Sequence, residues 1–170
     1  MEKRTGFKMA ENDITLVGKE IHVGEAAPDF TLTKMDLSPL KLADLGNKVK
    51  LIAAVPSVDT KVCELETIRF NQEAEKLGDQ AVVLTVSLDL PFAQSRFCAA
   101  EGISNAIVAS DYQNRSFGEA YGCLIDELKL LNRSVFVLDH NNKVVYVEYL
   151  KQNTDFPNYD AALDAAKALL

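Results

Sequence analysis

The sequence has little of what secreted and membrane proteins require. Its three cysteines, Cys63, Cys98 and Cys123, are too few and odd in number for a secreted disulfide framework. No apolar run is long enough to span a bilayer, and the polar segment 1–13 does not resemble a secretory signal. We therefore expect a cytoplasmic protein without a membrane partner, in which any disulfide serves chemistry rather than architecture.

Positive charge is also scarce. The chain carries 18 lysines and arginines against 25 acidic residues, which gives a formal net charge of -7. Binding to a phosphate backbone depends on lysine and arginine, so we expect no nucleic-acid partner. The cysteines and the two histidines lack the paired spacing of metal ligands. We expect neither a metal nor a cofactor.

The sequence does contain enough apolar residues for one core, since 48% of its 170 residues are hydrophobic. Apolar runs at 50–55 and 81–88 are typical of central strands buried on both faces. Between them, the period of apolar residues predicts a helix over 62–77 that ends at Gly78. Shorter strands are predicted at 30–33, 106–109, 134–139 and 144–150, and further helices at 92–101 (after Pro91), 114–121 and 159–170.

The N-terminal part is predicted to form a β-hairpin, with strands at 14–17 and 20–23 joined by Gly18 and Lys19. Residues 1–13 are expected to be a flexible tail, and residues 14–170 a single domain. The order of the elements predicts an α/β protein, with a central mixed β-sheet flanked by helices on both faces.

The segment 56–63, Pro-Ser-Val-Asp-Thr-Lys-Val-Cys, falls where a buried strand ends and a helix begins. Reactive groups in α/β sheets favour that edge. Cys63 would lie in the first helical turn, where the helix dipole and free amide groups favour a thiolate, the reactive form of cysteine. Thr60 can direct its hydroxyl toward the sulfur, and Pro56 stiffens the loop.

Each of these residues also has an ordinary structural interpretation. Cys63 shares an apolar helical stripe with Phe70 and Leu77, which would equally suit a core thiol. Thr60 could be the N-cap of the helix, the commoner role for a threonine at this position. Position in the sequence alone does not decide between these interpretations.

The pattern Pro56-xxx-Thr60-xx-Cys63 resembles the PxxxTxxC active-site signature of peroxiredoxins. Residues 88–102 are similar to the bacterial thiol peroxidase (Tpx) branch of that family, the atypical 2-Cys peroxiredoxins, and the resemblance covers nearly everything after Asp13. It implies a thioredoxin-like fold with an added N-terminal β-hairpin. It also implies a homodimeric peroxidase that reduces hydrogen peroxide and organic hydroperoxides, with thioredoxin as the reductant.

The same resemblance implies roles for five residues. Cys63 matches the peroxidatic cysteine, which becomes a sulfenic acid, and Cys98 matches the resolving cysteine, which forms an intramolecular disulfide with it. Arg133 matches the arginine that completes the site, although by itself it would also suit a surface position at a strand edge. Thr60 and Pro56 match the threonine and the proline of the signature, which implies that both belong to the active site.

The helical spacing of Gln94 and Glu101 around Cys98 predicts that this cysteine lies on a polar face. Cys63 and Cys98 lie on separate predicted helices, so their α-carbons should not start within the roughly 4.4–6.8 Å that a disulfide needs. Partial unwinding near both cysteines is therefore predicted. Cys123, in an apolar setting, is predicted to be a packing residue.

Two other functions remain open at this point. A dithiol-disulfide oxidoreductase acting on proteins would favour two cysteines at CxxC spacing, which this sequence lacks. A non-enzymatic thioredoxin-like binding module would leave Cys63 as an ordinary protonated thiol at neutral pH. Titration of the thiol separates these alternatives from a peroxidase.

Overall fold

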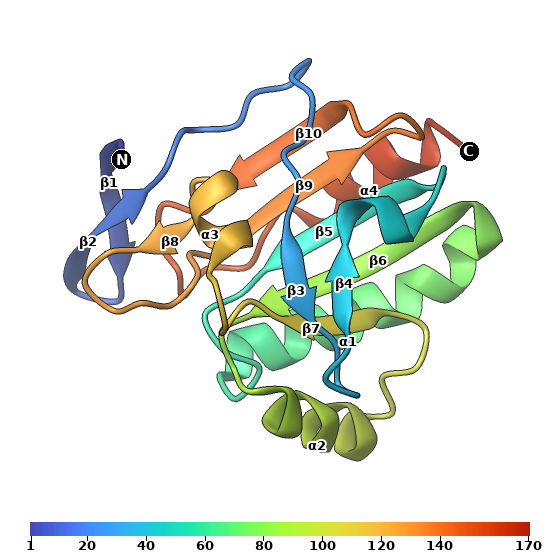
Figure 1. The fold of residues 1–170 in the computed structure, drawn as a ribbon, viewed down its shortest axis with the longest axis horizontal. Coiled ribbons are helices and arrows are strands. Elements are labelled where there is room, and N and C mark those ends of the chain that lie inside the picture. Colours follow the sequence, from blue (N-terminus) through green and yellow to red (C-terminus); the bar gives the residue numbers. More distant parts are fainter.

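The computed structural model describes residues 1–170 and shows an α/β protein with a seven-stranded mixed sheet (Figure 1). In chain order the elements are β1 (Lys3–Met9), β2 (Asn12–Val17), β3 (Thr31–Thr33), β4 (Pro39–Lys41), η1 (Leu42–Leu45), β5 (Val49–Ala54), α1 (Lys61–Leu77), η2 (Gly78–Gln80), β6 (Ala81–Ser87), α2 (Pro91–Glu101), β7 (Ile107–Ser110), α3 (Ser116–Ala120), β8 (Leu124–Ile125), β9 (Ser134–Leu138), β10 (Val144–Tyr149) and α4 (Tyr159–Lys167). The large sheet has the order β10-β9-β5-β6-β7-β3-β4, and a small sheet has the order β1-β2-β8. The predicted fold class is confirmed.

The two central strands determine where the reactive segments lie. β5 and β6 pair in parallel in the middle of the large sheet, with Val49 opposite Ala81. Every residue of β5 is buried, as its continuous apolar run predicts. Because parallel strands end at the same edge of a sheet, the segments that lead into α1 and α2 leave from one edge.

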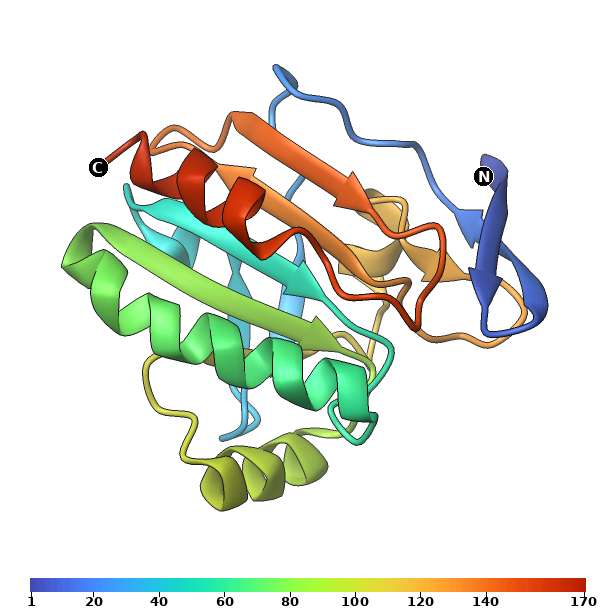
Figure 2. The same cartoon turned by 180° about the vertical axis from the view of Figure 1, so that it is seen from behind.

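Helices cover both faces of the large sheet. α1 and α4 lie on one face (Figure 2), where Phe70, Leu77 and Leu163 pack into one core cluster with the strands. On the opposite face, η1 and α3 contribute Leu42 and Phe117 to a second cluster. No helix combines the length and the apolar character needed to cross a membrane.

The N-terminal hairpin differs from the prediction. β1 pairs with β2, with Met9 opposite Asn12, so the hairpin turns at residues 10–11 rather than at 18–19. The expected flexible tail over residues 1–13 is corrected accordingly, since it is a paired strand from Lys3 onward, and no strand forms at 20–23. Gly18 serves close packing instead of a turn, because the position of a Cβ there is taken by the Glu119 carbonyl.

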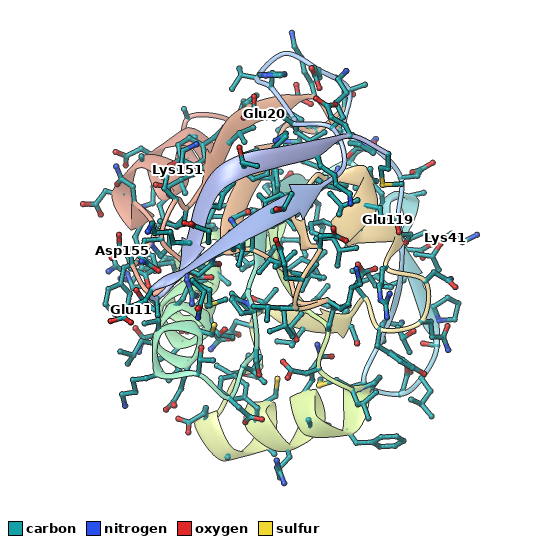
Figure 3. The ribbon with its side chains drawn as sticks, turned by 90° about the vertical axis from the view of Figure 1, so that its left-hand side faces the viewer. Glu11, Glu20, Lys41, Glu119, Lys151 and Asp155 are labelled. Carbon is teal, nitrogen blue, oxygen red and sulfur yellow. The ribbon has the colours of Figure 1, made fainter.

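The hairpin docks on the C-terminal part of the chain. The Lys8 N–H donates to the Lys151 carbonyl at 2.7 Å, and the Asn153 N–H donates to the Lys8 carbonyl at 2.9 Å. Figure 3 faces this end of the molecule, with the hairpin in front and Glu11, Lys151 and Asp155 labelled on it and around it. The first strand and the segment before α4 are therefore neighbours in space.

Candidate active site

Cys63 lies in the first turn of α1, after the loop that follows β5. Thr60 is the N-cap of this helix. Its hydroxyl accepts a hydrogen bond from the Cys63 N–H at 3.3 Å and donates to the Ser57 carbonyl at 3.2 Å. The structure thus shows the capping interpretation of Thr60, with its hydroxyl bonded to the backbone rather than to the sulfur.

Arg133 meets the sulfur of Cys63 directly. Its Nη2 donates to Cys63 Sγ at 3.0 Å. Arg133 is 2% exposed and Cys63 is 0% exposed, so the contact is buried and the surface interpretation of Arg133 is wrong. The guanidinium places a positive charge against the sulfur, in surroundings where charges interact more strongly than in water.

Three further hydrogen bonds orient Arg133. Its Nη1 donates to Glu66 Oε1 at 3.3 Å, its Nε to the Asn153 carbonyl at 2.9 Å, and its backbone N–H to Asn153 Oδ1 at 2.6 Å. Asn153 is held in turn, because its side-chain amide donates to Asn132 Oδ1 at 2.6 Å and to the Lys8 carbonyl at 3.1 Å. The guanidinium is thus positioned from α1, from the C-terminal segment and, through Lys8, from the N-terminal hairpin.

Glu66 belongs to the site but was missed in the sequence. It is fully buried, three residues after Cys63 and so on a neighbouring position of the same helix face. Burial raises the pKa of Glu66 to about 7, against the opposing effect of Arg133. Its Oε2 atom has no hydrogen-bond partner. The three-residue spacing from Cys63 could have predicted that Glu66 lies near the sulfur. Asn132 and Asn153 reach the site only through long-range folding, which no local sequence pattern indicates.

A cavity of about 230 Å³ opens beside Arg133, with a largely apolar wall. Cys63 is fully buried and does not line the cavity, but Arg133 lines it and also contacts the sulfur of Cys63. Three predicted site residues, Pro56, Thr60 and Arg133, thereby meet around one space next to Cys63. The complete lining is Met9, Pro56, Thr60, Lys61, Val62, Arg133, Asn153 and Thr154.

Cys98 lies on α2 but not on a polar face, which corrects the prediction. It is 6% exposed and packs in a cluster with Val58. The prediction failed because Gln94, one turn earlier, is itself buried, with its amide nitrogen donating to Ser87 Oγ and to the Ala109 carbonyl, each at 3.0 Å. Burial raises the pKa of the Cys98 thiol to about 11.

None of the three cysteines is paired in a disulfide. Cys63 and Cys98 each lie within regular helix, in the first turn of α1 and near the end of α2. Cys123 is fully buried in the core cluster on the α3 side of the sheet, in agreement with its expected packing role, and burial raises the pKa of its thiol.

Comparison with known proteins identifies the class. The family model described as Redoxin matches residues 22–163. The solved structure of a peroxiredoxin-like protein from Aquifex aeolicus superimposes with a TM-score of 0.91 at 39% identity, covering 98% of both chains. A thiol peroxidase from Chromobacterium violaceum shares the fold, with a TM-score of 0.85 at 22% identity over 95% of both chains. The chain belongs to the redoxin family.

Curated relatives narrow the class to one activity. A thiol peroxidase of Bacillus subtilis (strain 168) is 54% identical over 157 residues, covering 92% of this chain and 93% of the relative. A thiol peroxidase of Listeria innocua is 53% identical over 163 residues, covering 96% of this chain and 98% of the relative. The protein is a thiol-dependent peroxidase of the peroxiredoxin type, and the resemblance noted in the sequence is confirmed.

Proposed function

We propose that Cys63 is the peroxidatic cysteine and that Arg133 stabilises charge while the peroxide bond breaks. The observation that carries this proposal is the 3.0 Å contact between Arg133 Nη2 and Cys63 Sγ beside the cavity. The thiolate attacks the terminal oxygen of the hydroperoxide and the O–O bond breaks. The leaving alkoxide or hydroxide takes up a proton equivalent to the one that the Cys63 thiol released on ionising, and departs as an alcohol or water. Cys63 becomes a sulfenic acid, while the guanidinium and the amides of the first helical turn offset the charge that moves onto the leaving oxygen.

Thr60 and Pro56 have supporting roles in this proposal. Both line the cavity, and the Thr60 hydroxyl, which caps α1, can rotate to donate to a bound peroxide oxygen. Pro56 is buried and limits the motion of the loop before Cys63. The largely apolar wall supports organic hydroperoxides as substrates alongside hydrogen peroxide.

Cys98 is the proposed resolving cysteine. Its thiol condenses with the Cys63 sulfenic acid, so that an S–S bond forms and water leaves. Thioredoxin then reduces the disulfide by thiol exchange and regenerates both thiols. A cytoplasmic location, where such reductants keep thiols reduced, is part of the proposal. Assembly as a homodimer is proposed from the family resemblance alone.

A peroxide consumption assay coupled to thioredoxin and its reductase tests the assignment. Cys63→Ser should consume no peroxide, Cys98→Ser should consume one equivalent and then stop, and Cys123→Ser should turn over like the wild type. Peroxide consumption by Cys63→Ser would end the primary assignment. Continued turnover of Cys98→Ser with thioredoxin would remove Cys98 from the mechanism.

The wild type and the same cysteine variants also distinguish the peroxidase from the two competing functions. A dithiol-disulfide oxidoreductase would reduce a protein disulfide substrate and leave peroxide untouched. A binding module would do neither, and its Cys63 would show no thiolate absorbance at neutral pH. We expect peroxide consumption together with thiolate absorbance that disappears in Cys63→Ser.

A further inference from the structure

Asp89, between β6 and α2, is bonded to the loop that leads to Cys63. One oxygen of its carboxylate accepts a hydrogen bond from Ser57 Oγ at 2.7 Å. The other accepts from the Val58 N–H at 2.9 Å and from Ser87 Oγ at 2.6 Å. The peroxidase chemistry described above uses none of these contacts, although they hold the approach to the reactive sulfur.

The hydrogen-bonded chain continues from Asp89 into α2. Ser87 Oγ also accepts from Gln94 Nε2 at 3.0 Å. Gln94 is 0% exposed and lies one helical turn before Cys98, on the same side of α2. An unbroken chain, Ser57–Asp89–Ser87–Gln94, therefore joins the loop before α1 to the helix that carries the second cysteine.

Apolar packing joins the same two segments. The Val58 side chain is 1% exposed and lies in one cluster with Phe97 and Cys98. Val58 is thus held to Asp89 through its backbone and to α2 through its side chain. Moving Cys98 out of this cluster removes packing from Val58, and moving Val58 breaks its bond to Asp89.

We propose that Asp89 is a positioning residue that joins the two cysteine-bearing segments into one unit, so that they loosen together and not singly. The inference rests on the proposed function, because it concerns the condensation of the Cys63 sulfenic acid with the Cys98 thiol, which forms an S–S bond and releases water. While the hydrogen-bonded chain Ser57–Asp89–Ser87–Gln94 is intact, both cysteines stay in their helices and the sulfenic acid persists. A persistent sulfenic acid can react with a second peroxide, which transfers one oxygen and leaves as water or an alcohol; the resulting sulfinic acid is not returned to the thiol by thiol exchange.

Asp89 therefore influences how the sulfenic acid is partitioned between disulfide and sulfinic acid. Removing its carboxylate leaves the loop before α1 and Ser87 at the end of β6 without their shared acceptor, so the link from that loop to Gln94 on α2 is broken. Both segments then open more often, and condensation speeds up relative to further oxidation. A purely structural role would lower the stability of the protein without this change in partition.

A single-turnover experiment on the full-length reduced protein tests the inference. One equivalent of hydrogen peroxide is added, samples are quenched over time with a trap specific for sulfenic acid, and intact-protein mass spectrometry measures the products. In Asp89→Ala we expect the lifetime of the sulfenic acid to fall by about tenfold, because the lost hydrogen bonds involve a charged acceptor. We expect the peroxide concentration that gives half sulfinic acid to rise by about the same factor.

Two further variants keep the result interpretable. Gln94→Leu preserves most of the buried volume of α2 but removes the donor to Ser87, and it should shorten the lifetime in the same direction. Asp139→Ala is the matched control, because Asp139 Oδ1 accepts the N–H groups of Asn141 and Lys143 at 2.8 and 2.9 Å, in the β9–β10 turn at the opposite edge of the sheet.

The possible outcomes are distinct. Unchanged lifetimes in Asp89→Ala and Gln94→Leu would overturn the inference while leaving the proposed function intact. An equal shortening in Asp139→Ala would also overturn it, since general loss of stability would then explain the effect. A wild-type protein that forms no intramolecular disulfide would overturn the proposed function and this inference with it.

Discussion

Arg133 and Glu66 form a buried ion pair, with 3.3 Å between Nη1 and Oε1 and side-chain exposures of 2% and 0%. The arginine favours the ionised glutamate, but burial outweighs this effect and raises the pKa of Glu66 to about 7. The same guanidinium contacts Cys63 Sγ. The charge balance beside the sulfur therefore changes close to neutral pH.

The first prediction concerns stability against pH. Because the pKa of Glu66 is raised in the folded state, its contribution to stability is complete below its ordinary value of 4.5 and is lost as the pH rises through about 7. Glu66→Gln lacks this titration. Between about pH 5 and pH 8, the difference in free energy of unfolding should move by about 2–3 kcal/mol in favour of the variant.

Urea unfolding at a series of pH values measures this difference. The same series in a Cys63→Ser background removes any contribution from titration of that thiol. A difference between the two proteins that stays constant with pH would show that Glu66 does not titrate in this range.

The second prediction concerns the charge at the sulfur. Arg133→Met should lower the second-order rate constant for peroxide by about 100-fold, because a donor aimed at the reacting atoms is lost. The rate constant of Arg133→Lys should lie between those of the wild type and Arg133→Met, since lysine keeps the positive charge but not the planar guanidinium. Peroxide consumption under single-turnover conditions gives the rate constant. A wild-type rate in Arg133→Met would exclude this role for the arginine.

The third prediction concerns the anchor of Arg133. Asn153→Ala removes the acceptor of the Arg133 N–H and the donor to Asn132, which should cost about 1–3 kcal/mol of stability and about tenfold in the peroxide rate constant. Gln152→Ala is the matched control, because Gln152 bonds the backbone of Ala10 in the hairpin without touching Arg133. Equal peroxide rate constants in both variants would contradict the anchoring role.

The fourth prediction concerns thiol reactivity. Burial raises the pKa of Cys98 from 9.0 to about 11, so its thiolate fraction at neutral pH should be about 100-fold below that of a free cysteine. Alkylation of reduced Cys63→Ser, followed by peptide mass spectrometry, should show correspondingly slow labelling of Cys98 that accelerates up to about pH 11. Labelling at the rate of a free cysteine would place Cys98 outside the cluster in which the structure buries it.

The fifth prediction concerns docking of the hairpin. Gly18 and Gly6 both have positive φ, 104° and 94°, but a Cβ on Gly18 would collide with the Glu119 carbonyl while a Cβ on Gly6 meets open space. Gly6→Ala should therefore cost about 1 kcal/mol through backbone strain, and Gly18→Ala about 3 kcal/mol or more. Chemical unfolding of both variants measures the difference, and equal losses would argue against close packing at Gly18.

Elements with a local signal could be predicted from the sequence. The apolar runs of β5 and β6 are buried strands as expected, and Gly78 and Gly102 end α1 and α2. β1 gave no such signal, because most of its residues are charged or exposed and only Phe7 is fully buried. Its pairing with β2 and its docking on the C-terminal segment are decided by long-range contacts.

The residues of the site likewise include some that a local sequence signal predicts and some that only long-range contacts bring together. Thr60 and Cys63 lie in one short segment, so the sequence could place them together. The position of Arg133 was predicted only through family resemblance, and its contact with the sulfur depends on how β9 lies beside β5. The burial of Cys98 could not be predicted from its helical neighbours, because Gln94 satisfies its amide donors inside the protein.

The bonds between Lys8 and Asn153 connect the two ends of the chain. During translation, Cys63, Cys98 and Arg133 therefore leave the ribosome before Asn153, the residue that anchors the guanidinium. A nascent chain carries the sulfur without its oriented arginine. Under the proposed function, full reactivity toward peroxide therefore requires that residue 153 has left the ribosome.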